Sequence, residues 1–415
     1  MNKIEFSKHT LENGLRLIIQ QDKTTPMAVV NILYDVGSRD ESLDKTGFAH
    51  LFEHLMFGGS INIESFDEPI EMAGGKNNAF TNTDITNYYE VMPAQNIETA
   101  LWLESDRMLS LAFNPESLET QRKVVSEEYK EHYINQPYGD VSHLMSELCF
   151  KVHPYRWPTI GASLKHIEDA TLKDVKAFFK KHYLPNNAIM AICSPMSEQE
   201  ILPLVEKYFG EIKMGEVPVR NLPKEPAQTA YRNLKVQRKV STNAFYMSFH
   251  ALERTHPDFY AMDIITDLLS NGKSSRMYQR LVKDNPLFGN ISCYHTGNHD
   301  PGLVKVSGKL LPNISFESAE AAVFAEIEKL CNEIIDEQEL QKVKNKIEST
   351  HQFSNVDLGE RAFSLAYYEL LFNDTNRINT DFEYYQKVTT QDVQRVAKEI
   401  FRKENCSTMY YEAMK

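Results

Sequence analysis

The sequence of 415 residues predicts an α+β fold of two similar halves, each of roughly 200 residues and each mixing strands with helices. Three observations support this prediction. Two internal repeats occur at nearly the same offset, and a polar stretch with several prolines separates the two halves.

The clearest repeat lies near the end of each half. The segments Thr171–Val175 and Thr389–Val393 each open an amphipathic helix with a threonine at the cap position, at an offset of 218 residues. Each helix leads into an apolar strand, predicted at Ala188–Cys193 and Ser407–Tyr411. Because a capped helix before a strand is common in mixed proteins, this match alone does not establish a duplication.

A second match has almost the same offset. The predicted strand Val29–Val36 and the Gly58 after its helix correspond to Asn243–His250 and Gly272, 214 residues later. Two matches at nearly one offset favour a duplicated domain over coincidence.

The boundary between the halves is predicted near the middle of the chain. The stretch 213–232 is polar, lacks both helical and strand periodicity, and contains three prolines: Pro218, Pro223 and Pro226. We therefore predict one domain at 1–215, a linker at 216–232 and a homologous second domain at 233–415.

The composition is that of a folded globular protein, with 42% apolar and 25% charged residues. The formal net charge of -13 argues against nucleic acid and anionic membranes as partners. The chain has no run of 18 apolar residues and no apolar signal region at its start, so we expect a cytoplasmic protein without a membrane span. Five cysteines without a Cys-x-x-Cys spacing predict neither disulfides nor a thiolate zinc site.

The sharpest motif lies in the segment Gly47–Gly59, which has helical apolar spacing and which Thr46 is placed to cap. His50 and His54 are four residues apart, so both imidazoles project from one face and can share a metal. The carboxylate of Glu53 reaches the same edge of the cleft as the two imidazoles, but it does not point along the direction of a metal ligand. This placement suits a general base that holds a metal-bound water.

A bland alternative is a helix whose histidines are merely packed or exposed. The pattern His-x-x-Glu-His arises by chance about 0.03 times in a chain of this composition. A metal site also needs a third ligand, and the sequence offers one.

The third ligand comes from a second helix, predicted over 114–129 with a proline at its first position. Glu128 shares a face with two residues that should point toward the core, Val124 and Val125. Glu128 is therefore expected to point inward, whereas Glu127 turns toward solvent.

Two histidines, one glutamate and an open position for water form a hydrolytic zinc arrangement. His132, one turn after Glu128, is a rival ligand, a second-shell group or a surface histidine.

These residues carry a family likeness. The motif His50–His54, with Glu128 located 74 residues after His54, resembles the inverted motif of the pitrilysin/insulinase zinc metallopeptidase family. Further similar segments cover most of residues 8–193: Leu11–Leu15, Asp35–Glu41, Asn78–Thr81, His153–Tyr155 and Pro185–Ala188. The later half is similar to the family more weakly, at Ser274–Tyr278.

The resemblance implies two homologous α/β-sandwich domains, each a mostly antiparallel sheet packed with helices, that form a half-clamshell like the mitochondrial processing peptidase beta subunit and its bacterial relatives. It also implies zinc, Glu53 as the base, and an edge strand that pairs with a peptide substrate at Asn78, Ala79, Phe80 and Thr81. Strand pairing reads the peptide backbone more than its side chains.

One zinc per chain is expected, because the repeat places Ile264, Asp267 and Leu268 where the first half has its metal motif. Gln121 stands where many relatives have a glutamate beside the metal ligands, and its amide can hydrogen-bond but brings no charge.

Active relatives often carry an Arg and a Tyr, spaced by seven, that stabilise the tetrahedral intermediate. This chain has Val282 and Gly289 there, and neither donates a side-chain hydrogen bond. Arg276 and Arg280 lie nearby, and their spacing favours structural roles.

We therefore expect a zinc endopeptidase completed by a homologous partner chain that supplies the Arg and Tyr in a heterodimer. A self-sufficient homodimer is an alternative. A non-catalytic scaffold or assembly subunit is another, since fold does not fix function.

Overall fold

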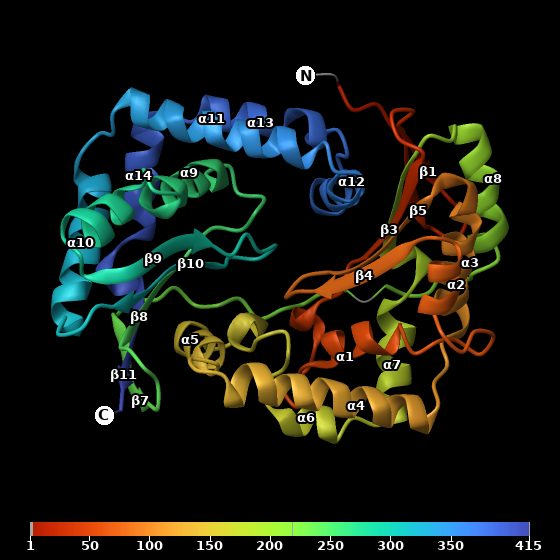
Figure 1. The fold of residues 1–415 in the computed structure, drawn as a ribbon, viewed down its shortest axis with the longest axis horizontal. Helices are drawn as coiled ribbons and strands as arrows, with labels where there is room; N and C mark the ends of the chain where they lie inside the picture. The colour runs from red at the N-terminus through yellow and green to blue at the C-terminus, as the bar shows by residue number, and fades with distance from the viewer. Residues whose placement is uncertain (1–2, 218, 415) are drawn as a thin grey trace. The chain divides into compact units, whose positions relative to one another are not determined.

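The computed structural model describes residues 3–217 and 219–414, which divide into two compact units, each built around one β-sheet (Figure 1). Three chain segments form the first unit: Met1–His132, Trp157–Leu222 and Gln352–Thr380. The second unit is formed by Tyr133–Arg156, Pro223–His351 and Asp381–Lys415. Pro218, in the predicted linker, lies outside the described residues.

The first unit contains a six-stranded sheet. From edge to edge its strands are β1 (Ser7–Thr10), β2 (Arg16–Gln21), β6 (Ala188–Ser194), β3 (Met27–Tyr34), β5 (Thr86–Pro93) and β4 (Lys76–Thr81). Strands β2 and β6 run parallel, and the other neighbouring pairs are antiparallel. The central β3 and β6 are mostly apolar and buried, whereas β4 is an edge strand with no partner strand on its outer side among the described residues.

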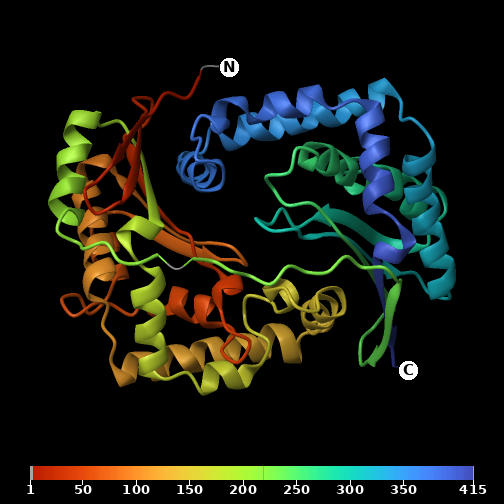
Figure 2. The same ribbon diagram turned by 180° about the vertical axis from the view of Figure 1, so that it is seen from behind.

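Helices cover both faces of this sheet (Figure 2). They are α1 (Phe48–Leu55), α2 (Asp67–Met72), α3 (Ile97–Ser110), α4 (Pro115–Tyr129), α6 (Leu164–Glu168), α7 (Leu172–His182), α8 (Glu198–Phe209) and α12 (Leu358–Phe372). Helix α12 packs across β3 and β6, where Leu365 and Ala366 join a buried apolar cluster with Val29 and Ile189. The sheet is thus shielded from water on the face opposite α1 and α7.

The second unit contains a five-stranded sheet. Its strands are β7 (Arg232–Arg238), β11 (Cys406–Ala413), β8 (Ala244–His250), β10 (Leu303–Leu310) and β9 (Phe288–His295), in spatial order. Its helices include α5 (Val141–Cys149), α9 (Phe259–Ser270), α10 (Phe316–Asn332) and α14 (Thr390–Ile400). Two further helices, α11 (Glu337–Ser354) and α13 (Arg377–Lys387), contain the points where the chain passes from one unit to the other.

The two sheets have the same topology. The order β2-β6-β3-β5-β4 in the first sheet matches β7-β11-β8-β10-β9 in the second, and in each sheet the first of these pairs is parallel and the rest are antiparallel. The predicted α+β class with two similar, mostly antiparallel domains is confirmed.

The helix starts that revealed the repeat are also alike. Thr171 and Asp174 form a capping box at α7, and Thr389 and Asp392 form the same box at α14. In each half the following strand, β6 or β11, lies in the interior of its sheet.

The compact units group the chain differently from the predicted limits 1–215 and 233–415 in two places. The segment Tyr133–Arg156 belongs to the second unit, where Met145 and Cys149 of α5 pack with Met409 and Tyr411 of β11. The segment Gln352–Thr380 belongs to the first unit through α12. The physical reason is burial, because the apolar face of each helix is covered by the sheet of the other half.

Among the residues that the structure describes, none of the helices combines the length and the apolar character needed to span a lipid bilayer. The five cysteines are free thiols in the structure.

Candidate metal centre

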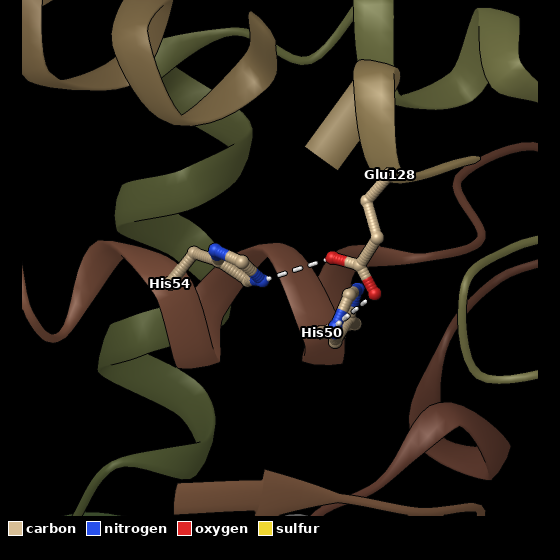
Figure 3. Close-up of side chains that lie close together, drawn as sticks. All are labelled: His50, His54 and Glu128. Carbon is tan, nitrogen blue, oxygen red and sulfur yellow. Dashed lines mark ion pairs between the residues drawn. The ribbon is translucent and has the colours of Figure 1, made fainter. Parts of the chain in front are cut away.

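Helix α1 presents two imidazoles on one face. The ring centroids of His50 and His54, one turn apart, lie 4.8 Å from each other. The opposite face carries Leu51, Phe52 and Leu55, which are buried in the first unit. This burial anchors the helix by its apolar face, and the histidines point toward the end of α4 (Figure 3).

Glu128 of α4 faces both histidines (Figure 3). Its Oε1 lies 3.7 Å from His50 Nε2, and its Oε2 lies 3.4 Å from His54 Nε2. Ligand atoms from the three residues all lie within 4.8 Å of one another. In a tetrahedral zinc site with bonds of about 2.0–2.2 Å, neighbouring ligand atoms are about 3.3–3.6 Å apart. The donor atoms therefore have nearly the spacing that zinc requires.

The protonation states also suit a metal. Burial lowers the pKa of His50 to about 4, so its imidazole is neutral at physiological pH. The hydrogen bond with His54 holds the pKa of Glu128 below its usual value, so this carboxylate is ionised. Neutral imidazole and carboxylate are the ligand forms of these side chains. Within residues 3–217 and 219–414, this is the one group of three or more His, Cys, Asp and Glu side chains with such a geometry.

Glu53 lies on the same helix and outside the ligand group. Burial raises the pKa of its carboxyl, and hydrogen bonds with the side chain and backbone of Thr81 counteract that rise. A carboxylate with a raised pKa is a better proton acceptor near neutral pH. Thr81 ends β4, so the contact ties this carboxyl to the edge strand.

The residues predicted to meet substrate lie on that edge strand. Asn78 is exposed, and Ala79, Phe80 and Thr81 are half-buried. The Phe80 ring packs against Phe363 of α12, with centroids 5.4 Å apart, so this edge strand contacts α12.

The side chains of α4 point as predicted for Glu127 and Glu128, but not for Val124. Glu127 is exposed and pairs with Lys130 at 2.7 Å, whereas Glu128 is turned toward α1. Val125 is fully buried, but Val124 is 45% exposed, so its predicted core position is wrong. The buried stripe of α4 instead runs through Leu118, Val125, Ser126 and Tyr129.

Two other predicted neighbours remain at the periphery. Gln121 is half-buried, two turns before Glu128 on the same helix. His132 is exposed in the π-helical turn Lys130–Asn135 and is not in the ligand group found among the described residues.

The second unit offers no comparable chemistry at the repeated positions. Ile264 and Leu268 of α9 are buried apolar residues. Val282 packs against the core, and Gly289 lies on β9. The Arg276 guanidinium is held by Glu339 at 2.6 Å, so it has a structural partner.

A buried polar network behind Glu53 carried no signal in the sequence. The guanidinium of Arg107 is buried, pairs with Glu104, and stacks over the ring of Tyr88 at 4.3 Å. The hydroxyl of Tyr88 lies 3.4 Å from that of Tyr183. Burial raises the pKa of both tyrosines, and the Glu53 charge adds to this rise.

Two family models match the chain. Residues 16–161 match a model described as insulinase, peptidase family M16. Residues 169–347 match a model described as the peptidase M16 inactive domain. The candidate metal centre lies wholly within the first match.

Curated relatives are similar over most of the chain. A zinc protease PqqE from Helicobacter pylori is 29% identical over 407 residues, covering 97% of this chain and 91% of the relative. A probable mitochondrial-processing peptidase subunit beta from Arabidopsis thaliana is 25% identical over 358 residues, covering 82% of this chain and 66% of the relative.

Solved structures share the fold. The crystal structure of a protease from Helicobacter pylori has a TM-score of 0.94 and 28% identity, covering 99% of this chain and 100% of that one. A peptidase M16 inactive domain from Pseudomonas fluorescens has a TM-score of 0.89 with 16% identity, covering 99% and 98% of the two chains.

Proposed function

Because the chain belongs to the insulinase family, peptidase family M16, we propose that it is a zinc-dependent endopeptidase that hydrolyses extended peptides or unfolded segments. The observation that carries the proposal is the convergence of Glu128 of α4 on His50 and His54 of α1, next to the half-buried Glu53 on the same helix as the histidines.

His50, His54 and Glu128 would hold one zinc ion per chain, leaving a fourth position open. The chemistry supplied by the bound metal is the activation of a water and the polarisation of the scissile carbonyl. The three donors sit on two helices whose apolar faces are buried, so the site is pre-organised by the core of the first unit.

Glu53 is the proposed general base. Its position beside the ligands lets it take a proton from the attacking water and return it to the leaving amine. Burial supports this role, since it raises the pKa of the carboxyl toward the working pH. Thr81 keeps the carboxyl at the end of β4.

The free side of β4 is the proposed substrate site. A peptide could pair with β4 as an antiparallel or parallel strand, alongside Asn78, Ala79, Phe80 and Thr81. It would bind through its backbone, and its scissile bond would lie near Glu53. Binding of this kind requires an extended segment, which a folded protein does not present.

A homologous partner chain is the proposed source of the oxyanion donors. Val282 and Gly289 lack them, and Arg276 is engaged by Glu339. The heterodimer is the simplest assembly that supplies an Arg and a Tyr, and a homodimer that uses other donors is the alternative.

The direct test measures zinc content and hydrolysis of a quenched extended peptide on one sample. We expect one zinc per chain, loss of cleavage after chelation, and recovery on adding zinc. Elemental analysis that gives two metals per chain, or none after growth in zinc, would refute the proposal.

A non-catalytic scaffold subunit is the second candidate. It is favoured by the match of residues 169–347 to a domain described as inactive, together with the missing donors of the second half. Zinc binding without cleavage, both alone and with every homologous chain tested, would favour it.

A further inference from the structure

Helix α1 begins without a cap of its own. Its N-cap residue is Gly47, with φ of +86°, and no side chain there accepts from the first turn. The predicted cap, Thr46, is wrong, because its hydroxyl instead lies 2.8 Å from His166 Nδ1 and accepts from Ala162 N at 2.7 Å. The free N–H groups of the first turn therefore need another acceptor.

Glu41 supplies that acceptor from outside the helix. Its Oε2 accepts from Gly47 N at 2.9 Å, and its Oε1 accepts from Ala49 N at 2.8 Å. Ala49 directly precedes His50 in the chain. One buried carboxylate therefore holds the backbone of the turn that carries the first imidazole.

Trp157 fixes the carboxylate in turn. Its Nε1–H donates to Glu41 Oε2 and to Ser38 O, both at 3.1 Å. The indole is buried, and the chain after it lies against the start of α1. A Cβ on Gly47 would come within 2.6 Å of Ile160 O, so the two segments touch with no room for a side chain.

The same stretch of chain also reaches the second ligand helix. We call residues 157–168 the strap. His166, in the strap, contacts Thr46 at the start of α1, and its helix α6 packs against α4, which carries Glu128. The strap therefore links the starting turn of α1 to the helix of the third ligand.

We propose that Glu41 is a positioning residue of the metal centre, whose carboxylate locks the first turn of α1 so that His50 and His54 keep their spacing to Glu128. The inference rests on the proposed function, in which these residues hold zinc. The two oxygens of Glu41 accept from two backbone N–H groups and one indole N–H. Burial raises the pKa of Glu41 to about 8, and these three donors oppose that rise because they stabilise the ionised carboxylate. An amide in its place loses one acceptor and sets an NH2 group against N–H donors.

The test is a zinc affinity measurement by competition with a chromophoric chelator. For Glu41→Gln we expect the dissociation constant for zinc to rise about tenfold or more, as for lost supporting hydrogen bonds at other metal sites. Glu41→Asp keeps the carboxyl group on a shorter arm, so its dissociation constant for zinc should lie between those of Glu41→Gln and the unchanged chain. In the cobalt-substituted protein, the visible absorption bands of Glu41→Gln should shift, because they report ligand geometry.

Asp357→Ala is the matched control. Asp357 caps α12 in the same unit by accepting from Glu360 N at 2.9 Å, so its loss destabilises the unit without touching α1. We expect a lower melting temperature with an unchanged zinc affinity and cobalt spectrum. If Glu41→Gln and Asp357→Ala change the zinc affinity and the cobalt spectrum by equally small amounts, the inference is overturned.

Trp157→Phe covers the case in which Glu41→Gln does not fold. It removes the indole N–H and keeps an aromatic ring, so a weaker zinc affinity supports the inference and an unchanged affinity and cobalt spectrum overturn it. If the unchanged chain binds no zinc, the proposed function itself fails, and the two failures are distinct.

Discussion

Replacing His182 should reduce the loss of folding stability that occurs as the pH falls from neutral to acidic values. Its imidazole is 1% exposed at the end of α7, and neither ring nitrogen has a hydrogen-bond partner among the residues that the structure describes. Burial lowers the pKa of His182 to about 4, and Lys181 and Arg220 lower it further, whereas Asp40 and Asp35 raise it.

The sign follows from the two states. The folded protein holds His182 neutral, while the unfolded chain protonates it near its usual pKa of about 6.5. Stability from this group is complete above pH 6.5 and is lost as the pH falls toward 4. A difference of about 2.5 pKa units corresponds to about 3 kcal/mol, most of it lost between pH 7.5 and 4.5.

The assay is urea unfolding of zinc-free protein at pH 7.5 and 4.5. His182→Phe keeps a ring beside Phe178, whose centroid lies 4.7 Å away, and any packing penalty shifts both values equally. We expect the pH-dependent loss to shrink by about 2 to 3 kcal/mol relative to the unchanged chain. His132→Gln, at an exposed histidine, should leave the loss unchanged. An equal loss in His182→Phe and the unchanged chain would refute the reasoning.

The candidate metal centre gives two further predictions. His54→Ala should remove the metal, because a ligand is lost. Glu53→Gln should keep the metal and abolish hydrolysis, because only the base is lost. Equal metal loss in both variants, measured by elemental analysis, would make Glu53 a ligand. Glu127→Gln should retain most activity, because the side chain is solvent-exposed, while Glu128→Gln should lose zinc; the reverse result would mean that the site uses the other face of α4.

Local signals in the sequence were sufficient for the repeat. The threonine caps at 171 and 389 and the apolar strands after them depend on residues within a single turn or strand, and the structure has them at these positions. The shared strand order could not be read in this way, because it depends on pairing between segments far apart in the chain.

Helices α5 and α12, which pack on the sheet of the other half of the sequence, show what an amphipathic pattern cannot predict. The apolar faces of α5 and α12 predict burial, but a pattern does not say which sheet covers the face. The same limit explains Val124, which follows the apolar spacing of α4 and still faces solvent. In this helix the buried stripe is set by the elements that pack against it.

The contacts that hold the start of α1 also could not be predicted from the local sequence. Glu41 lies within a segment that carried the family likeness, but its role depends on Gly47 and on Trp157, which is 116 residues later in the chain. A glutamate shortly before the helix that carries His50 and His54 forms no recognisable sequence pattern. Only the fold brings the carboxylate to the free N–H groups of the first turn.

The last prediction concerns the partner and rests on Val282 and Gly289. Alone, the chain should bind zinc but cleave peptides about 10²–10³ times more slowly than with a homologous chain that supplies Arg and Tyr, the usual effect of a lost oxyanion donor. The structure also makes a constructive test reasonable, because Gly289 lies on β9 with no positive φ, and a Cβ there would meet Leu311 Cδ2 at 3.9 Å, an ordinary contact.

The double variant Val282→Arg with Gly289→Tyr should gain activity. Because Val282 packs against the core, a melting curve must first show that the variant folds. The matched control is Val282→Leu with Gly289→Phe, which adds similar bulk without a hydrogen-bond donor and should gain nothing. Full turnover by the purified chain alone would refute the need for a partner. Because the control separates donors from bulk, a gain confined to the Arg and Tyr variant would assign the missing chemistry to those two positions.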